Sequence, residues 1–151
     1  MGVEIERKWL VKELPEDISR YPNEKYIQGY LCTSPVVRVR KEGDRYVLTY
    51  KGEGLLKREE YNMPLTKDAF EKLIRKCDGK LIVKQRYFIP TGDQEGHVIE
   101  LDIYKGDHEG LITAEVEFSS EEEAGSFMAP SWFGEDVSLR EEYKNSWLSR
   151  S

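Results

Sequence analysis

Alternation between apolar and charged residues restricts the fold of this chain more than any other feature of its sequence. Between positions 99 and 102, for example, Ile99 and Leu101 alternate with Glu100 and Asp102. Successive side chains of a β-strand point to opposite faces, so this period of two predicts strands with one apolar and one charged face. Turn sequences such as EGDR and TGDQEG separate several of the segments that show the pattern. The expected strands are Val3–Val11, Tyr26–Cys32, Val36–Glu42, Asp44–Gly52, Leu56–Pro64, Lys80–Pro90, His97–Lys105 and Leu111–Ser119.

Three further segments favour helices. Thr66 is placed to cap a helix whose apolar stripe comprises Phe70, Leu73, Ile74 and Cys77. Two more helices are expected, from Glu121 to Met128 and from Ser138 to Leu148. We find no internal repeat, low-complexity tract or linker, so we expect a single domain over residues 1–151. Eight mostly antiparallel strands with few helices predict a mainly β (α+β) fold, either a closed barrel or a sandwich.

The composition argues against several classes of protein. The net charge is -6 at pH 7 and no long basic run is present, which disfavours a general nucleic-acid-binding protein. The two cysteines form no CxxC pair and only two histidines are present, which argues against a zinc site of cysteine and histidine ligands. His97 and His108 lie beside turns, where we expect them at the surface. No apolar run approaches the ~18 residues of a membrane span, and no apolar signal core is present. We therefore expect a soluble, cytoplasmic protein with free thiols and no membrane partner, as a monomer or a homodimer.

The charges on the polar faces are sorted by sign. A face that meets only water usually mixes signs, because neighbouring like charges repel. Clustered carboxylates are satisfied by a metal cation, and clustered guanidinium and ammonium groups by a polyphosphate. The sorting therefore points to a site that binds both. The acidic pairs are Glu4/Glu6, Glu100/Asp102 and Glu115/Glu117, and the basic pairs are Arg38/Arg40 and Lys84/Arg86.

Strand parity places seven acidic and seven basic residues on one candidate inner face. Their near cancellation suits a water-filled tunnel of mixed charge better than a one-sided sheet. The acidic residues are Glu4, Glu6, Glu60, Glu100, Asp102, Glu115 and Glu117. The basic residues are Lys8, Arg38, Arg40, Lys51, Arg58, Lys84 and Arg86.

These motifs, in this order, resemble those of the CYTH superfamily, also called triphosphate tunnel metalloenzymes. The short length and the QGYL segment are similar to its compact bacterial branch. Asn62 departs from the pattern, because a second acidic residue is expected two places after Glu60. The matching segments are Glu4-Ile5-Glu6-Arg7-Lys8, Gln28-Gly29-Tyr30-Leu31, Arg38-Val39-Arg40, Leu48-Thr49-Tyr50-Lys51, Arg58-Glu59-Glu60, Lys84-Gln85-Arg86, Glu100-Leu101-Asp102, Glu115-Val116-Glu117 and Tyr143-Lys144-Asn145.

The resemblance implies an eight-stranded antiparallel closed barrel with a few flanking helices, whose tunnel holds a triphosphate. It implies that Glu4, Glu6 and Glu117 hold a catalytic Mg²⁺ or Mn²⁺. Glu100, Asp102 and Glu115 would orient water or hold a second ion, and Glu60 is counted with the metal-binding residues. The residues expected to bind phosphate oxygens are Lys8, Arg38, Arg40, Lys51, Arg58, Lys84, Arg86 and Lys144.

Two routes for activating the attacking water stay open. By parity Tyr30 and Lys84 fall on the charged face. The resemblance implies that such a Tyr–Lys pair removes the proton, with the lysine lowering the pKa of the phenol. In the alternative route the carboxylates and their metal ion activate the water.

The resemblance favours a metal-dependent phosphohydrolase that cleaves the terminal phosphate of inorganic triphosphate, of nucleoside triphosphates, or of both. A class IV adenylyl cyclase and a thiamine triphosphatase are the alternatives within the family. A non-catalytic polyphosphate-binding module is a third alternative. It would need the basic residues but not the paired carboxylates, so the presence of Glu4, Glu6, Glu115 and Glu117 favours catalysis.

Overall fold

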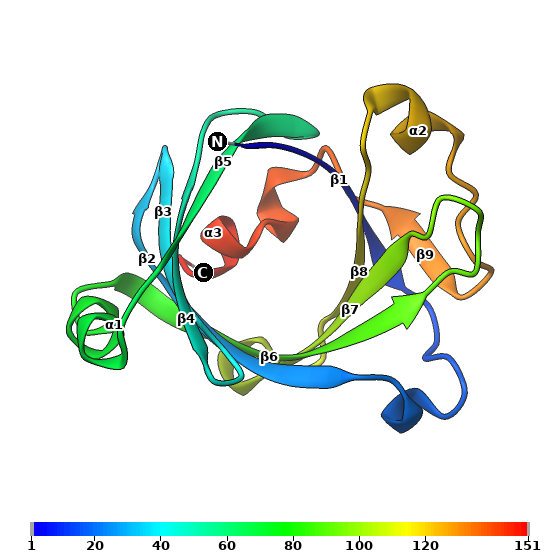
Figure 1. Ribbon diagram of the computed structural model, residues 1–151. Coiled ribbons are helices and arrows are strands. Elements are labelled where there is room, and N and C mark those ends of the chain that lie inside the picture. Colours follow the sequence, from blue (N-terminus) through cyan, green and yellow to red (C-terminus); the bar gives the residue numbers. More distant parts are fainter. Residues whose placement is uncertain (1, 151) are drawn as a thin grey trace.

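The computed structural model describes residues 2–150, and its strands close into an eight-stranded antiparallel β-barrel (Figure 1). The order around the barrel is β5-β4-β3-β2-β6-β7-β8-β1, and β1 pairs again with β5 to close it. The expectation of a closed barrel is confirmed, and the sandwich is excluded. The strands are β1 (Gly2–Val11), β2 (Asn23–Thr33), β3 (Val36–Glu42), β4 (Arg45–Lys51), β5 (Lys57–Pro64), β6 (Asp78–Pro90), β7 (Val98–Lys105) and β8 (Ile112–Glu117).

A ninth strand, β9 (Phe133–Asp136), was not expected from the sequence. It pairs with the far end of β1, where Trp9 lies opposite Asp136 and Val11 lies opposite Phe133. Because β5 pairs only with Gly2–Ile5, the same edge of β1 is left free further along, and β9 covers it. A strand of four residues with a single apolar side chain is too short to show alternation of apolar and polar residues. β9 is therefore recognised only from its pairing with β1 in the structure.

The helices are shorter than the sequence pattern predicted. Helix α1 (Lys67–Ile74) begins as expected, since the hydroxyl of Thr66 accepts a hydrogen bond from the Ala69 N–H at 3.1 Å, but it ends before Cys77. Helix α2 (Glu121–Ser126) ends where Phe127 turns extended. No helix of residues 2–150 is long and apolar enough to cross a membrane.

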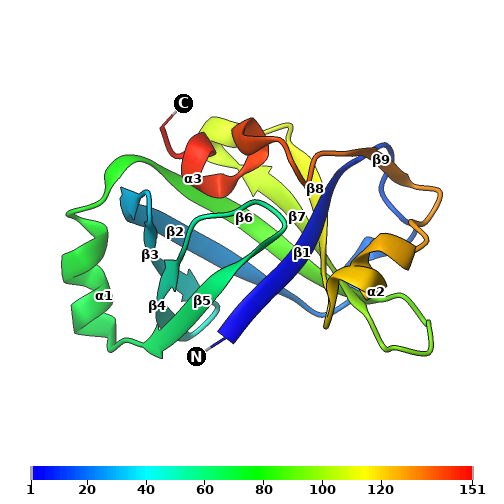
Figure 2. The same ribbon diagram turned by 90° about the horizontal axis from the view of Figure 1, so that it is seen from above.

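The continuous helix expected from Ser138 to Leu148 is wrong. The segment instead holds two short turns of helix, η3 (Glu141–Tyr143) and α3 (Asn145–Leu148), separated by Lys144 in an extended conformation. The break places the Lys144 ammonium where it donates to the Gly54 carbonyl at 3.0 Å. The two turns lie across one end of the barrel (Figures 1 and 2).

The main apolar core lies outside the barrel. Outward-facing side chains of β1, β7 and β8, such as Trp9, Leu101 and Val116, pack beneath α2 and β9. A smaller cluster around Tyr30 and Tyr104 is covered by Leu148 of α3. With the apolar faces turned outward, the barrel interior is left to the charged faces.

The remaining elements are short connections. They are η1 (Ile18–Arg20) between β1 and β2, and η2 (Gly106–His108) between β7 and β8.

Candidate functional site

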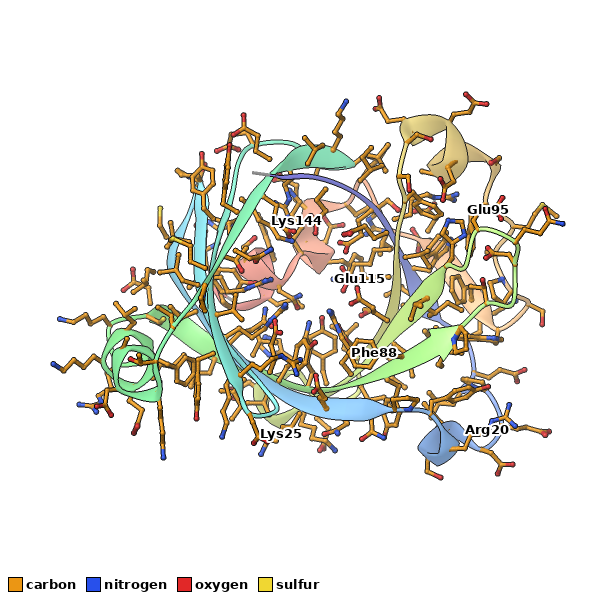
Figure 3. The ribbon with its side chains drawn as sticks, viewed as in Figure 1. Arg20, Lys25, Phe88, Glu95, Glu115 and Lys144 are labelled. Atoms are coloured by element: carbon orange, nitrogen blue, oxygen red, sulfur yellow. The ribbon has the colours of Figure 1, made fainter. Side chains whose placement is uncertain are left out.

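The barrel encloses a cavity of about 320 Å³ that is lined mainly by charged side chains. Figure 3 shows Glu115 and Lys144 inside the outline of the barrel and Lys25 outside it. Of the residues singled out from the sequence, all except Lys84 and Asp102 line this cavity. The predicted residues that line the cavity are Glu4, Glu6, Lys8, Tyr30, Arg38, Arg40, Lys51, Arg58, Glu60, Arg86, Glu100, Glu115, Glu117 and Lys144.

Two carboxylates of the cavity have no cationic partner. Glu6 on β1 lies directly opposite Glu117 on β8, and within residues 2–150 neither has a basic group within 4.0 Å. Burial, together with Glu115 and Glu4, raises the pKa of Glu6 well above its usual value. Burial, together with Glu4, Glu60 and Glu100, raises the pKa of Glu117. Like charges opposite one another destabilise a sheet, so this pair is stabilised by a proton or by a cation.

The third carboxylate of the expected metal set has basic partners. Both oxygens of Glu4 accept hydrogen bonds from Nζ of Lys51 at 3.0 Å, and Nε of Arg58 lies 3.5 Å away. Burial raises the pKa of Glu4, but Lys51 and Arg58 outweigh it, and the net shift is downward. Lys51 also lies 3.4 Å from Glu60. Four charges from β1, β4 and β5 thus neutralise one another on this wall.

Asp102 and Lys84 lie beneath the cavity and not on its surface. Both side chains are fully buried, and the Lys84 ammonium is 2.8 Å from the Asp102 carboxylate. Arg86 donates to both oxygens of Asp102, at 2.7 and 2.8 Å, and its other contacts are Glu115 at 3.0 Å and Glu100 at 3.2 Å. Burial lowers the pKa of Lys84 to about 7 against the opposing effect of Asp102. The expectation that both residues face the tunnel is therefore corrected: strand parity points them inward, but Arg86 and its partners cover them.

The expected pair of Tyr30 and Lys84 is not formed. Tyr30 lines the cavity, and its hydroxyl accepts a hydrogen bond from Nε2 of Gln28 at 2.9 Å. Lys84 lies opposite Tyr26 in the β2–β6 ladder, whereas Tyr30 lies opposite Asp78. Four positions along a strand correspond to roughly 13 Å at ~3.3 Å per residue, so shared strand parity did not bring these side chains together.

Arg38 is a buried cation without an anionic partner. Its side chain is 6% exposed, Nη2 donates to the Thr49 hydroxyl at 3.2 Å, and Nε has no hydrogen-bond partner. No carboxylate of residues 2–150 lies within 4.0 Å of it. Its neighbour Arg40, by contrast, donates to Glu42 at 2.8 Å. A guanidinium group that has no carboxylate partner is available to bind the oxygens of an anion.

The cavity also contains residues that sequence reasoning missed. Glu42 has the same parity as Arg38 and Arg40, so extending the alternation by one step would have found it. Arg140 and Ser138 reach the cavity from the segment after β9, which has no strand or helix period. Such residues carry no local signal, because their place depends on where the chain end crosses the barrel.

A second group of potential metal ligands lies apart from the cavity. Asp93, Glu95 and His97 offer atoms that all lie within 4.8 Å of one another. His97 is buried, against the expectation of a surface position, because its ring nitrogens contact Asp93 at 2.5 Å and Glu123. The imidazole thereby ties the β6–β7 connection to α2, which is a structural role.

Comparisons with known proteins agree with this geometry. The CYTH domain family matches residues 2–149. An inorganic triphosphatase of Nitrosomonas europaea is 40% identical over 152 aligned positions, which cover 98% of this chain and 97% of that protein. An inorganic triphosphatase of Acetivibrio thermocellus is 35% identical, with 100% and 96% covered. The crystal structure of an inorganic triphosphatase superposes with a TM-score of 0.72 at 36% identity and covers 100% of this chain and 97% of that one.

Replacement of Asp102 tests the buried ion pairs. Among residues 2–150, Asp102 is the only carboxylate within 4.0 Å of the Lys84 ammonium and one of three around Arg86. Asp102→Asn would therefore leave Lys84 with none of these carboxylates and Arg86 with two. Removing one partner of a buried pair costs about 3–5 kcal/mol, and we expect the free energy of unfolding to fall by that amount in a denaturant titration. Glu24→Gln is the control, because its partner Arg45 is 61% exposed and such a surface pair contributes about 0–1 kcal/mol. Equal effects of the two substitutions would contradict the assignment.

Proposed function

This chain belongs to the CYTH domain family, and on that basis we propose that it is a divalent-metal-dependent inorganic triphosphatase. It cleaves the terminal phosphate of inorganic triphosphate inside the barrel. One observation carries the proposal: an unpaired guanidinium, Arg38, and an unpaired carboxylate pair, Glu6 and Glu117, face the same cavity. An anionic substrate accompanied by a cation satisfies both at once. Relatives that are 40% and 35% identical over nearly their whole length are named inorganic triphosphatases, which supports this substrate.

The phosphate oxygens are bound by the basic side chains that line the cavity. Arg38 and Arg40 on β3 present planar forks that suit two oxygens each, and Lys144 reaches in from the extended break before α3. Lys51 and Arg58 are already paired with Glu4, so the part of the cavity wall that they form carries less positive charge toward the phosphate. Lys84 acts from below the surface by sharing Asp102 with Arg86.

The unpaired carboxylates fit a hard divalent cation, Mg²⁺ or Mn²⁺. Glu6 and Glu117 would supply oxygen ligands, and among residues 2–150 no basic side chain would have to leave them for the ion to bind. Glu4 lines the same cavity. Asp102 does not fit, because two basic side chains engage it out of reach of the cavity. The ion, when bound, would neutralise charge that develops on the phosphoryl oxygens.

Phosphoryl transfer to water requires mainly positioning and charge stabilisation. Here the basic side chains hold the substrate, and the covered end of the barrel restricts access of bulk water. The proton of the attacking water needs an acceptor in the cavity. Tyr30 would be such a group in its phenolate form, because it lines the cavity and its oxygen accepts a hydrogen bond from Gln28, a contact that the phenolate can also make.

Phosphate release from a panel of inorganic triphosphate, ATP and thiamine triphosphate tests the function. We expect turnover of inorganic triphosphate with Mg²⁺ or Mn²⁺ and none with a chelator. Arg38→Gln should lower kcat/KM by about 10²–10³, the effect of removing one donor that stabilises the transition state. Arg45→Gln, 61% exposed, is the matched control and should be unaffected. Cyclic AMP as product would indicate a cyclase, and tight binding without phosphate release would indicate a binding module.

Replacement of Glu6 tests the cation site. Glu6→Gln removes a charge that Glu117, Glu115 and Glu4 oppose, so without metal the variant should unfold at a temperature equal to or above that of the wild type. Mn²⁺ should raise the Tm of the wild type and hardly that of the variant. Because the pKa of Glu6 is raised, protons compete with the ion, and the stabilisation of the wild type should grow as pH rises. An equal rise in Tm for both proteins would rule out this site.

Replacement of Tyr30 tests the proton acceptor. Tyr30→Phe removes only the hydroxyl, and we expect kcat to fall by about 10²-fold with little change in KM. Gln28→Leu, which removes the donor to Tyr30 but not the phenol, is the matched variant and should retain most of the activity. Near-normal turnover of Tyr30→Phe would instead assign proton removal to the carboxylate route.

A further inference from the structure

Two guanidinium groups of residues that line the cavity lie over the ring of Tyr26. Its centroid is 4.6 Å from Cζ of Arg40 and 5.0 Å from Cζ of Arg86. Nζ of Lys84 is 6.0 Å away. One aromatic ring thus contacts three cations from two different strands.

Strand register explains this position. Tyr26 on β2 lies opposite Glu42 on β3 and opposite Lys84 on β6. Arg40 and Arg86 are each two residues from those partners, so both are its diagonal neighbours on the same face. Diagonal neighbours across a sheet are about 7–8 Å apart, within reach of aromatic and long side chains.

Tyr26 does not itself reach the site. It is 4% exposed and is absent from the residues that line the cavity. Within residues 2–150 its hydroxyl makes no hydrogen bond, so the ring face is the part that interacts. Tyr26 differs in this from Tyr30, which lines the cavity and whose hydroxyl accepts a hydrogen bond from Gln28.

The two arginines need such a group because their positive charges repel. Burial, then Arg38 and Arg86, lower the pKa of Arg40, which shows that the like charges act on it. The faces of an aromatic ring are negative, and a desolvated cation held over one is attracted to it. Carboxylates stabilise the two guanidinium groups unequally. Among residues 2–150, Arg86 has three carboxylates within 4.0 Å, whereas Arg40 has Glu42 alone.

We propose that Tyr26 is a positioning residue that holds the Arg40 guanidinium, and to a lesser degree that of Arg86, where they bind the oxygens of the polyphosphate. The inference rests on the proposed function for the identity of the ligand. The arrangement of the guanidinium groups exists without ligand and can be measured by itself.

Calorimetric titration of inorganic triphosphate into metal-free protein tests the effect on binding. Tyr26→Phe keeps the ring and should bind like the wild type. Tyr26→Leu should raise Kd about tenfold, which corresponds to about 1.4 kcal/mol. In an Arg40→Gln background the same Tyr26→Leu change should raise Kd less than about twofold, because the contact is already lost.

Phe70→Leu is the matched control for loss of a buried ring. Phe70 is 7% exposed and packs on Tyr46 outside the cavity, so its replacement should lower Tm but leave Kd unchanged. A Tyr26→Leu protein with wild-type Kd, or a Phe70→Leu protein with equally weakened binding, would overturn the proposal.

Arginine side-chain NMR separates the proposal from the proposed function. The Nε–Hε signal of Arg40, identified by its loss in Arg40→Gln, should be shifted upfield by the ring in ligand-free wild type and in Tyr26→Phe. It should return to an ordinary position in Tyr26→Leu. Wild-type protein that neither binds nor hydrolyses triphosphate would overturn the proposed function, while an unshifted Arg40 signal in that protein would overturn the role of Tyr26.

Discussion

The buried carboxylate of Asp102 is the interaction on which the charged interior depends. It accepts from Arg86 through two oxygens and contacts the Lys84 ammonium, with both Asp102 and Lys84 fully buried. Charges taken out of water cost free energy unless they are paired with opposite charges. This network forms the floor of the cavity and lets further charged side chains stand above it. The apolar faces of the same strands can then pack outward against α2 and β9.

Charge pairing is complete on some walls of the cavity and incomplete on others. Glu4, Lys51, Arg58 and Glu60 neutralise one another. Arg86 and Lys84 together offset two of the three carboxylates that lie around Arg86. Among residues 2–150, Arg38 has no carboxylate within 4.0 Å, and Glu6 has the carboxylates Glu117 and Glu115 as neighbours but no basic group within that distance. Arg38 is buried, Glu6 is half-buried and Glu117 is exposed, and all three line one cavity. Charges without a partner of opposite sign reduce stability, so this cavity marks the place where ligand charges would complete the pairing. The site is thus defined by what the protein leaves unpaired.

Much of the fold and of the site could be predicted from the sequence. Alternation placed eight strands, and parity assigned most cavity residues, including Glu115 on β8 and Lys51 on β4, to the inner face. Helix ends and the break at Lys144 could not be predicted, because they depend on contacts with Gly54 and with the barrel end. β9 and Arg140 were missed for the same reason, since neither follows a local period. The ring of Tyr26 was overlooked because a tyrosine among apolar residues has no distinguishing pattern.

The sequence by itself determined which side chains share a face, because the direction of a side chain from a strand is a local property of the backbone. It therefore specified a charged interior, an apolar exterior and the residues available to bind a cation and a polyphosphate. Only the tertiary structure decided which charges meet. Register and barrel closure placed Lys84 opposite Tyr26 and away from Tyr30, Glu6 opposite Glu117, and Asp102 beneath Arg86. Distances between strands depend on pairing partners far along the chain, and parity carries no information about them.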